Sequence, residues 1–430
     1  MRPISLYIDP GTGSMLFAAV MGIAAAAVYF LERLMIRLRF YLTGGRAGAE
    51  DQHTHPIVIF NESARYWTLF KPILEEFERR QEPVEYWTMD PKDPAFTGGF
   101  QYVHSTFIGE GNRGFARLNM MNAQICLSTT PGLEVYQWKR SRHVRFYVHV
   151  FHMINEGTGY RMFGLDFYDA VLLTGAFQER YIRKVETLRG LPAKEMPVVG
   201  LPYMDELLRR HEETLRPGAD KKDENGILPA ERTVLLAPSW GESGILSRFG
   251  AEIIDALLST GYHIIIRPHP QTVVSEKAIL KPLQDRYPEN DQLEWNYDSD
   301  NFDVLNRSDI LISDYSGVVY DFAMVFDRPV IYADTSYDPA PYDNAWLKGE
   351  KIWRFEKLAR FGVRLDPGDF GRIKEVIDGA IADGSLTAAR QEVKAEAWQY
   401  IGESSSRTVD YLLAKRDAYA AEKEKEQAAS

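Results

Sequence analysis

The sequence predicts the α/β fold class, with two Rossmann-like domains that face a cleft and one N-terminal transmembrane helix before them. Short apolar runs alternate with longer helix-like stretches along the body of the chain. A charged stretch at 209–229, interrupted by Gly and Pro, separates these runs into two sets. Because strands that alternate with helices form parallel sheets covered on both faces, each set predicts one sheet.

The composition describes a globular chain too long for one ordinary core. Its 430 residues suit two domains of about 100 to 200 residues each. A hydrophobic fraction of 45% beside 26% charged residues argues against a polytopic membrane protein. The net charge of -11 and the lack of a basic stripe exclude a nucleic-acid partner. Cys126 is the only cysteine, so we expect a buried thiol and a reducing compartment.

An uncharged apolar segment at 15–31 predicts the transmembrane helix. As a helix it would reach about 25 Å, close to the thickness of a hydrocarbon core. Four arginines follow it, at positions 33, 37, 39 and 46, whereas Arg2 alone precedes it. Because basic flanks stay cytoplasmic, we expect a single-pass protein of the inner (plasma) membrane with its large part in the cytoplasm. Residues 34–42 suit an interfacial helix on membrane lipid or a helix packed on the protein itself.

The apolar runs place the predicted strands and the domain boundaries. The first set covers 57–60, 84–88, 125–127, 145–150, 170–174 and 196–199, and the second covers 234–237, 263–267, 293–295, 310–313 and 330–332. The expected order is an anchor with a juxtamembrane helix at 1–42, a linker at 43–55, a first domain at 56–208, a second domain at 230–385, and a long helix that ends as a charged tail at 386–430.

The stretch 310–332 carries a strand, a polar turn and a helix in immediate succession. Ser316 and Gly317 stand where the helix begins, so its unpaired backbone N–H groups can hold phosphate oxygens. The alternative is an ordinary cap in which Ser316 or Asp314 satisfies those amides. Asp321, one helical turn further on, can reach a ribose hydroxyl or remain a solvated carboxylate.

A second motif, 264–270, fixes one imidazole at the end of a strand. His269 lies between Pro268 and Pro270, which remove backbone freedom where the ring must be aimed. This arrangement favours a catalytic or phosphate-binding group. Arg267 adds a guanidinium for a phosphate or, alternatively, for a carboxylate within the domain.

A third motif, 237–244, again joins a strand to a polar loop. Ser239 and Trp240 stand at its start. Trp240 can stack on a nucleotide base or lie in the core beneath the loop.

In the first half, 146–160 places two histidines near the end of a strand. His149 and His152 are three residues apart and therefore point to opposite faces while the strand continues. His152 is nearer the loop and is the better candidate for a general base. We expect no metal site, because no third ligand follows at a matching spacing.

Taken together, these motifs resemble the CDP-glycerol glycerophosphotransferase family of teichoic-acid primases and polymerases, which have the GT-B fold. The resemblance covers about 144–342. It rests on the segments 267–270 and 313–317 with Asp321 downstream, and on Gly200, Leu201, Pro202 and Asp205 at the junction of the domains.

The sequence departs from that family in two motifs. The usual Trp-His-Gly with a nearby Lys is here Phe151, His152 and Met153, so Arg161 is the candidate basic residue. The usual Pro-Thr-Trp-Arg is here 238–241 and ends in Gly, with Arg248 as a possible substitute.

The resemblance implies a transferase that moves glycerol phosphate, or a similar polyol phosphate, from a CDP-linked donor to a cell-envelope glycan or lipid-linked acceptor, releasing CMP. The first domain would bind the acceptor and the second the nucleotide donor, with no cofactor and no essential metal. His152 and His269 would be catalytic. The donor would be bound by Arg267, Ser239, Trp240, Ser313, Asp314, Ser316, Gly317 and Asp321. Two alternatives are a GT-B glycosyltransferase or epimerase acting on a nucleotide-sugar, and an inactive membrane-tethered nucleotide-binding protein.

Overall fold

The computed structural model describes residues 54–216, 232–298, 300–333 and 337–429. The predicted anchor at 15–31 and nearly all of the predicted linker lie outside these ranges. Within them, no helix has both the length and the apolar character needed to cross a bilayer.

The first sheet consists of six parallel strands in the order β3-β2-β1-β4-β5-β6. The strands are β1 (His55–Asn61), β2 (Val84–Thr88), β3 (Val103–Phe107), β4 (Asn122–Ser128), β5 (His143–Val150) and β6 (Ala170–Leu172). Alternate side chains of β1 enter different hydrophobic clusters, Val58 and Phe60 on one face and Ile57 and Ile59 on the other. Both faces of this sheet are therefore covered, as expected for a parallel sheet.

The second sheet repeats the same topology. It consists of β7 (Thr233–Leu236), β8 (His263–Ile266), β9 (Leu293–Trp295), β10 (Ile310–Ser313), β11 (Val330–Ala333) and β12 (Gly362–Leu365). Its spatial order is β12-β11-β10-β7-β8-β9, which is the order of the first sheet when its strands are counted along the chain. In this topology the strand order reverses between β1 and β4, and between β7 and β10. Ligands bind at the carboxyl ends of the strands that flank such a switch point.

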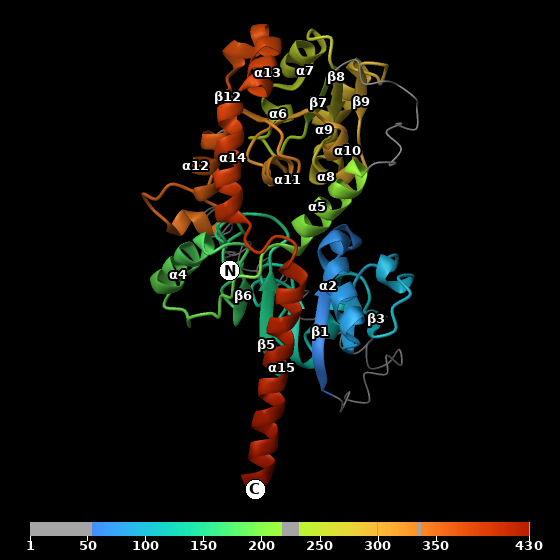
Figure 1. Ribbon diagram of the computed structural model, residues 1–430, viewed down its shortest axis with the longest axis vertical. Coiled ribbons are helices and arrows are strands. Elements are labelled where there is room, and N and C mark those ends of the chain that lie inside the picture. Colours follow the sequence, from blue (N-terminus) through green and yellow to red (C-terminus); the bar gives the residue numbers. More distant parts are fainter. Residues whose placement is uncertain (1–53, 217–231, 299, 334–336, 430) are drawn as a thin grey trace, which may run out of the picture. The chain divides into compact units, whose positions relative to one another are not determined.

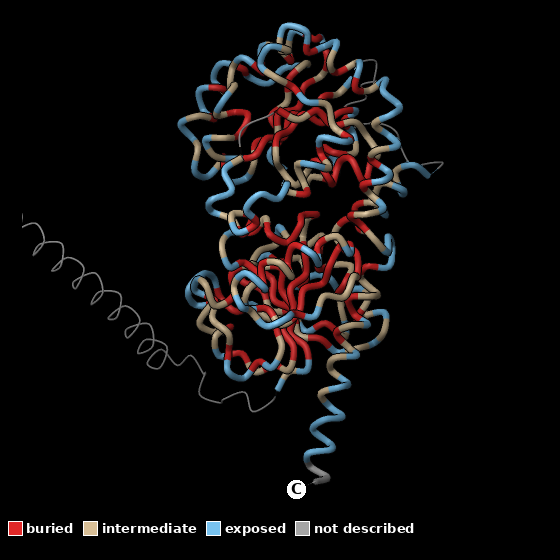
Figure 2. Tube along the Cα trace, turned by 90° about the vertical axis from the view of Figure 1, so that its left-hand side faces the viewer, coloured by how far each residue is buried: buried red, intermediate tan, exposed pale blue. Residues whose placement is uncertain are grey.

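Helices cover both sheets, and Figure 2 shows the strands as the buried centre of each half. In the first half they are η1 (Ala64–Tyr66), α2 (Trp67–Arg80), η2 (Pro94–Phe96), α3 (Gly111–Leu118), α4 (Phe177–Arg189) and α5 (Pro202–Leu215). The later ones are α6 (Ile245–Arg248), α7 (Gly250–Leu258), α8 (Pro270–Ser275), α9 (Lys277–Arg286), α10 (Phe302–Arg307), α11 (Val318–Val325), η3 (Asp343–Trp346), α12 (Trp353–Phe361), η4 (Pro367–Arg372), α13 (Ile373–Ala382), α14 (Gly384–Ala397) and α15 (Ser404–Ala429).

Three predicted elements differ from the structure. The predicted strand at 196–199 forms only isolated bridges, including one between Leu173 and Val198. The charged stretch at 209–229 is helical in its first part, because α5 continues to Leu215. The long helix expected from 386 is interrupted between α14 and α15, where Tyr400 and Gly402 have φ values of 54° and 82°.

After this interruption the chain returns to the first sheet (Figure 1). Helix α15 packs against α2, β1 and β4, whereas α14 packs against α11 and α12 of the second half. Val409 and Leu412 of α15 are fully buried in the same cluster as Ile57 and Ile59 of β1. The C-terminal helix therefore completes the core of the N-terminal sheet.

The two segments that connect the halves are tied to each other. Asp205 of α5 accepts hydrogen bonds from the Trp398 indole N–H at 3.0 Å and from the Ser404 backbone N–H at 2.9 Å. Gly200 has a φ of 91°, and a Cβ atom there would lie 2.3 Å from Ser404 Oγ. Both the backbone conformation and the close approach require glycine at this position.

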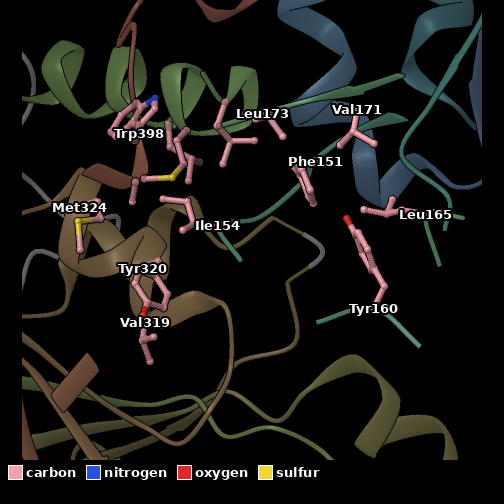
Figure 3. Close-up of a cluster of buried hydrophobic side chains, with 14 of the residues drawn as sticks. Phe151, Ile154, Tyr160, Leu165, Val171, Leu173, Val319, Tyr320, Met324 and Trp398 are labelled. Carbon is pink, nitrogen blue, oxygen red and sulfur yellow. The ribbon is translucent and has the colours of Figure 1, made fainter. Parts of the chain in front are cut away.

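One hydrophobic cluster contains side chains from both halves. Figure 3 shows Ile154, from the loop after β5, beside Tyr320 and Met324 of α11 and Trp398. All four side chains are buried. The loop after β5 is thus packed directly on the helix that follows β10.

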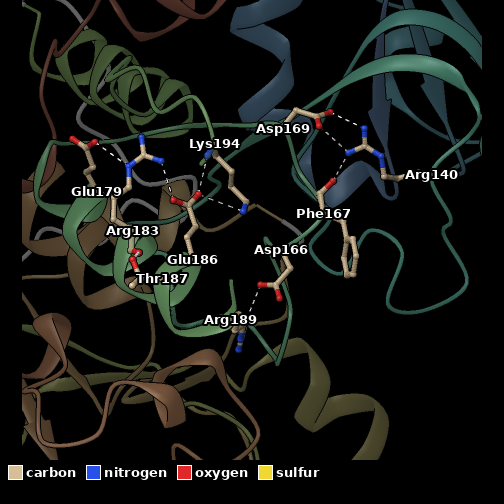
Figure 4. A network of polar contacts seen from close by, with 10 residues as sticks. All are labelled: Arg140, Asp166, Phe167, Asp169, Glu179, Arg183, Glu186, Thr187, Arg189 and Lys194. Carbon is tan, nitrogen blue, oxygen red and sulfur yellow. Dashed lines mark hydrogen bonds and ion pairs between the residues drawn. The ribbon is translucent and has the colours of Figure 1, made fainter. Parts of the chain in front are cut away.

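Ion pairs fix the far end of that loop (Figure 4). Arg189 of α4 pairs with Asp166 at 2.6 Å and also pairs with Asp343 of η3. Asp343 in addition accepts hydrogen bonds from the backbone N–H groups of Phe163 and Gly164, at 2.8 and 3.1 Å. Because these carboxylates are buried but paired, the network holds the loop in one position.

Candidate active site

The switch point of the second sheet is organised by one buried carboxylate. Asp314, which follows β10, accepts hydrogen bonds from the backbone N–H of Ser239 at 3.0 Å, of Ile245 at 3.3 Å and of Ser316 at 3.2 Å, and from the Ser239 hydroxyl. Burial raises the pKa of Asp314, and the bonds from Ser239 oppose this effect. Ser313 is also buried and donates to the Ala237 carbonyl at 2.6 Å. These side chains join the loops after β7 and β10.

The start of α11, next to the hydrogen bonds of Asp314, has backbone N–H groups without an acceptor among the described residues. No acceptor for the backbone N–H of Gly317 or Val318 lies within the described residues. Ser316 and Gly317 are half-buried. A Cβ atom at Gly317 would lie 3.2 Å from the sulfur of Met153, so the residue after His152 contacts this helix start.

His269 caps α8 with its own ring. Its Nδ1 accepts a hydrogen bond from the backbone N–H of Gln271 at 3.1 Å. A backbone N–H can only donate, so the neutral ring carries its proton on Nε2. Burial and the positive charge of Arg65 lower the pKa of His269, while Glu276 raises it. This imidazole is therefore a neutral donor through Nε2.

Two predicted donor-binding residues flank His269. Arg267 donates to the Asn296 side chain and, at 2.7 Å, to the Asp298 carbonyl, so much of its guanidinium is engaged within the second half. Trp240 is 39% exposed, and its ring centroid lies 6.5 Å from that of His269. The alternative in which Trp240 lies in the core is therefore wrong.

Asp321 is buried, like Ser313 and Asp314. It is 6% exposed, and its Oδ2 accepts a hydrogen bond from the Tyr203 hydroxyl at 3.1 Å. Its Oδ1 is buried without a partner, and burial raises the pKa of this carboxyl to about 7. The alternative of a solvated helix carboxylate does not apply, and Oδ1 is a buried acceptor without a hydrogen-bond partner among the described residues.

His152 lies just beyond β5 and is half-buried. Its Nδ1 is 2.8 Å from the Thr129 hydroxyl at the end of β4, and its ring centroid is 4.9 Å from that of Tyr66. Burial, followed by the positive charge of Arg65, lowers the pKa of His152 to about 4. His149 is fully buried and contacts the Tyr160 hydroxyl at 3.1 Å, so it lies in the core.

The structure brings the main predicted residues into one region. Met153 joins His152 to the start of α11, and the charge of Arg65 acts on both predicted catalytic histidines. Arg65, Tyr66 and Thr129 belong to none of the predicted motifs. They could have been found by their position in the segments that follow β1 and β4, the two strands that flank the first switch point.

Two other predictions concern cysteine and metal. Cys126 is a buried free thiol, as expected, and burial raises its pKa. Across the described ranges, no three His, Cys, Asp or Glu side chains gather as a metal site.

The fold and the site define a GT-B-like α/β protein with two parallel six-stranded sheets. The profile of the family described as CDP-Glycerol:Poly(glycerophosphate) glycerophosphotransferase matches residues 166–353. This segment of the chain is therefore similar to that family of glycerophosphotransferases. The matched segment contains every predicted donor-binding residue and His269, whereas His152 precedes it.

Solved structures share the fold at low sequence identity. A structure of the wall teichoic acid polymerase TagF soaked with CDPG is 13% identical, with a TM-score of 0.55, over 91% of this chain and 99% of that chain. The UDP-GlcNAc 2-epimerase from Neisseria meningitidis bound to UDP-GlcNAc is also 13% identical, with a TM-score of 0.57, over 83% of this chain and 99% of that one. A search of curated protein sequences found no match.

Proposed function

We propose that this enzyme transfers glycerol phosphate, or a similar polyol phosphate, from a CDP-linked donor to a cell-envelope glycan or lipid-linked acceptor, and releases CMP. The observation that carries the proposal is the contact of Met153 with Gly317. Because Met153 is the next residue after His152, this contact supports a position for His152 near the free amides of α11, the helix that follows β10. A base and a phosphate-binding helix start are the two components that this transfer needs.

His152 is the proposed general base. When its Nδ1–H donates to Thr129 Oγ1, Nε2 has a free lone pair for the proton of the acceptor hydroxyl. The acceptor oxygen forms a bond to the β-phosphorus while the bond from that phosphorus to the CMP oxygen breaks. Because its pKa is lowered to about 4, His152 is unprotonated at pH 7, so the Nε2 lone pair is not already occupied by a proton.

The second sheet supplies the proposed donor site. The amides of Gly317 and Val318 and the Nε2–H of His269 would neutralise charge on the phosphate oxygens as CMP leaves. Trp240 would stack on the cytosine, and Asp321 Oδ1 would accept from a ribose hydroxyl. Ser239, Ser313 and Asp314 act as positioning residues, because their side chains are bonded to the protein itself.

The membrane location also belongs to the proposal. The segment 15–31, with arginines after it, would hold the enzyme at the inner (plasma) membrane with its catalytic part in the cytoplasm. A lipid-linked acceptor would then be presented at the same surface.

Nucleotide release from the full-length enzyme in lipid vesicles tests the transfer. We expect CMP from CDP-glycerol, and a loss of roughly 100-fold or more in kcat for His152→Ala and for His269→Ala. His143→Ala is the matched control, because His143 is exposed at the opposite end of β5. CMP release that survives both substitutions would assign the chemistry to other residues.

The likeness to UDP-GlcNAc 2-epimerases supports one second candidate. This alternative is a glycosyltransferase or epimerase acting on a nucleotide-sugar, which would use the same phosphate site. Epimerisation of UDP-GlcNAc, or transfer from it, without CMP release from CDP-glycerol would establish this alternative. CDP binding with no turnover of any donor would instead indicate a nucleotide-binding protein without activity.

A further inference from the structure

Arg65 occupies the ligand-binding position of the first sheet, and no motif in the sequence analysis included it. It lies in η1, four residues after the end of β1 at Asn61. Strand β1 is paired with β4 on one side and β2 on the other, so its carboxyl end flanks the point where the strand order reverses. Parallel α/β sheets bind their ligands at this edge.

The local structure holds the Arg65 backbone in place and, among the described residues, offers its charge no carboxylate partner. The backbone N–H of Arg65 donates to the Ser63 hydroxyl at 3.4 Å, and that of Ala64 donates to Asp90 at 3.1 Å. Neither η1 nor α2 has an acidic residue in its first turn. A cation at this end of a helical segment opposes the helix dipole, so local stability does not account for an arginine here.

The guanidinium of Arg65 is available to a ligand. Arg65 is exposed, and its Cζ lies 4.7 Å from the ring centroid of Tyr66. Throughout the described part of the chain, no carboxylate lies within ion-pair distance of it. The neighbouring Glu62 instead accepts a hydrogen bond from the Thr130 hydroxyl at 3.2 Å.

Arg65 also lies close enough to act electrostatically on both imidazoles. Burial is the larger cause of the lowered pKa of His152 and of His269, and the charge of Arg65 lowers both further, although these residues follow strands of different sheets. The link to His152 is geometric as well, because Tyr66 lies near both: its ring centroid is 4.9 Å from that of His152 and 4.7 Å from the Arg65 guanidinium. Arg267, which was predicted to bind the donor, is already bonded to Asn296 and Asp298.

We infer that Arg65 binds the β-phosphate of the nucleotide-diphosphate donor between His152 and His269. The inference rests on the proposed transfer and names the residue that the first sheet contributes to donor binding. A guanidinium offers two parallel N–H groups to two phosphate oxygens and stays charged at every working pH. It would also offset the negative charge that the donor brings close to His152, so that this base stays unprotonated.

The test compares the affinities of CDP and CMP, which differ by the β-phosphate. Both nucleotides are titrated by calorimetry into the full-length protein in detergent or lipid. The proteins are the wild type, Arg65→Gln, Arg65→Lys and the matched control Arg142→Gln, which alters an exposed arginine beside the amino end of β5. We expect Arg65→Gln to weaken CDP binding by on the order of tenfold or more, and CMP binding by less than about threefold. Arg65→Lys should give an intermediate value, and Arg142→Gln none.

The remaining outcomes separate this inference from the proposed function. Unchanged CDP affinity in Arg65→Gln, with normal CMP release by the wild type, overturns the role of Arg65 and leaves the transfer intact. The same result together with weaker CDP binding in Arg161→Gln assigns the role to Arg161 instead. A preference for CDP that depends on Arg65, without turnover of CDP-glycerol, retains the phosphate contact and overturns the transfer. A wild type that binds neither nucleotide overturns both.

Discussion

The two switch points hold their imidazoles in different ways. On the second sheet, the Gln271 backbone N–H orients His269, and the ring lies between two prolines. On the first sheet, the Thr129 side chain contacts His152, and Tyr66 packs beside it; each of these residues follows a different strand. The arrangement around His269 is local in sequence, whereas the arrangement around His152 is assembled from three separate loops.

This difference suggests a division of roles. The proposed donor side is rigid, because the carboxylate of Asp314 satisfies backbone groups of both of its loops. The family profile also includes this side, at 166–353, and begins after His152. A single substitution can therefore remove a side-chain contact of His152, whereas the backbone N–H that orients His269 does not depend on the Gln271 side chain.

The largest expected effect is on the donor side, from Asp314→Ala. The substitution leaves buried N–H groups of Ser239, Ile245 and Ser316 without an acceptor, so we expect a loss of roughly 3 kcal/mol in the free energy of unfolding. Urea denaturation measures it, and CMP release should fall with it. Asp303→Ala, at an exposed position of α10, is the control, with an expected change below about 1 kcal/mol. Equal stability of the two variants would show that the hydrogen bonds accepted by Asp314 do not stabilise these loops.

Two single substitutions, compared with each other, test the difference between the supports of His152 and His269, and we expect a smaller effect from them than from Asp314→Ala. Thr129→Val removes the side-chain hydroxyl that contacts His152, so we expect kcat to fall about tenfold with little loss of stability. Gln271→Ala retains the backbone N–H that donates a hydrogen bond to His269 Nδ1, so kcat should stay within about twofold. Steady-state CMP release measures both. The reverse pattern would mean that His269, not His152, depends on a neighbouring side chain.

The smallest expected effect concerns the pH at which kcat/KM for CMP release begins to fall on the acid side. The pKa of His152 is lowered to about 4, so the base is protonated, and lost, only as the pH falls through that region. We therefore expect kcat/KM for CMP release to stay nearly constant from pH 8 down to about pH 5, since this parameter reports groups of the free enzyme. An unperturbed histidine would halve the rate near pH 6.5. A midpoint there would show that His152 is as exposed as an ordinary surface residue.

Most strands could be predicted from sequence, including β6 and β9 at sheet edges, and the two that were missed lack the apolar run on which such a prediction depends. Strands β2, β9 and β10 have the predicted bounds, because apolar or β-branched runs define them. The two strands without a prediction, β3 and β12, are each at an edge of a sheet. Edge strands bury less surface and so keep mixed sequences, such as VHSTF in β3, that have no clear apolar run.

The candidate site divides in the same way. His269, Ser316 and Gly317 could be found because the residues that orient them are adjacent in sequence. Arg65 and Thr129 could not, because their relation to His152 depends on the pairing of β1 with β4 and of β4 with β5. Local sequence does not determine which strands become neighbours. Asp314 was correctly placed at the turn, but its role as an internal hydrogen-bond acceptor required the loop after β7.

The burial of Val409 and Leu412 in the first sheet has a consequence for biosynthesis. During translation the strands of that sheet leave the ribosome before the second sheet, yet the helix that covers part of their apolar face follows the second sheet. Until α15 emerges, the nascent chain presents the exposed face beneath it to other proteins. A stop codon near Trp398 would therefore damage the beginning of the chain more than the second sheet, which is complete by then.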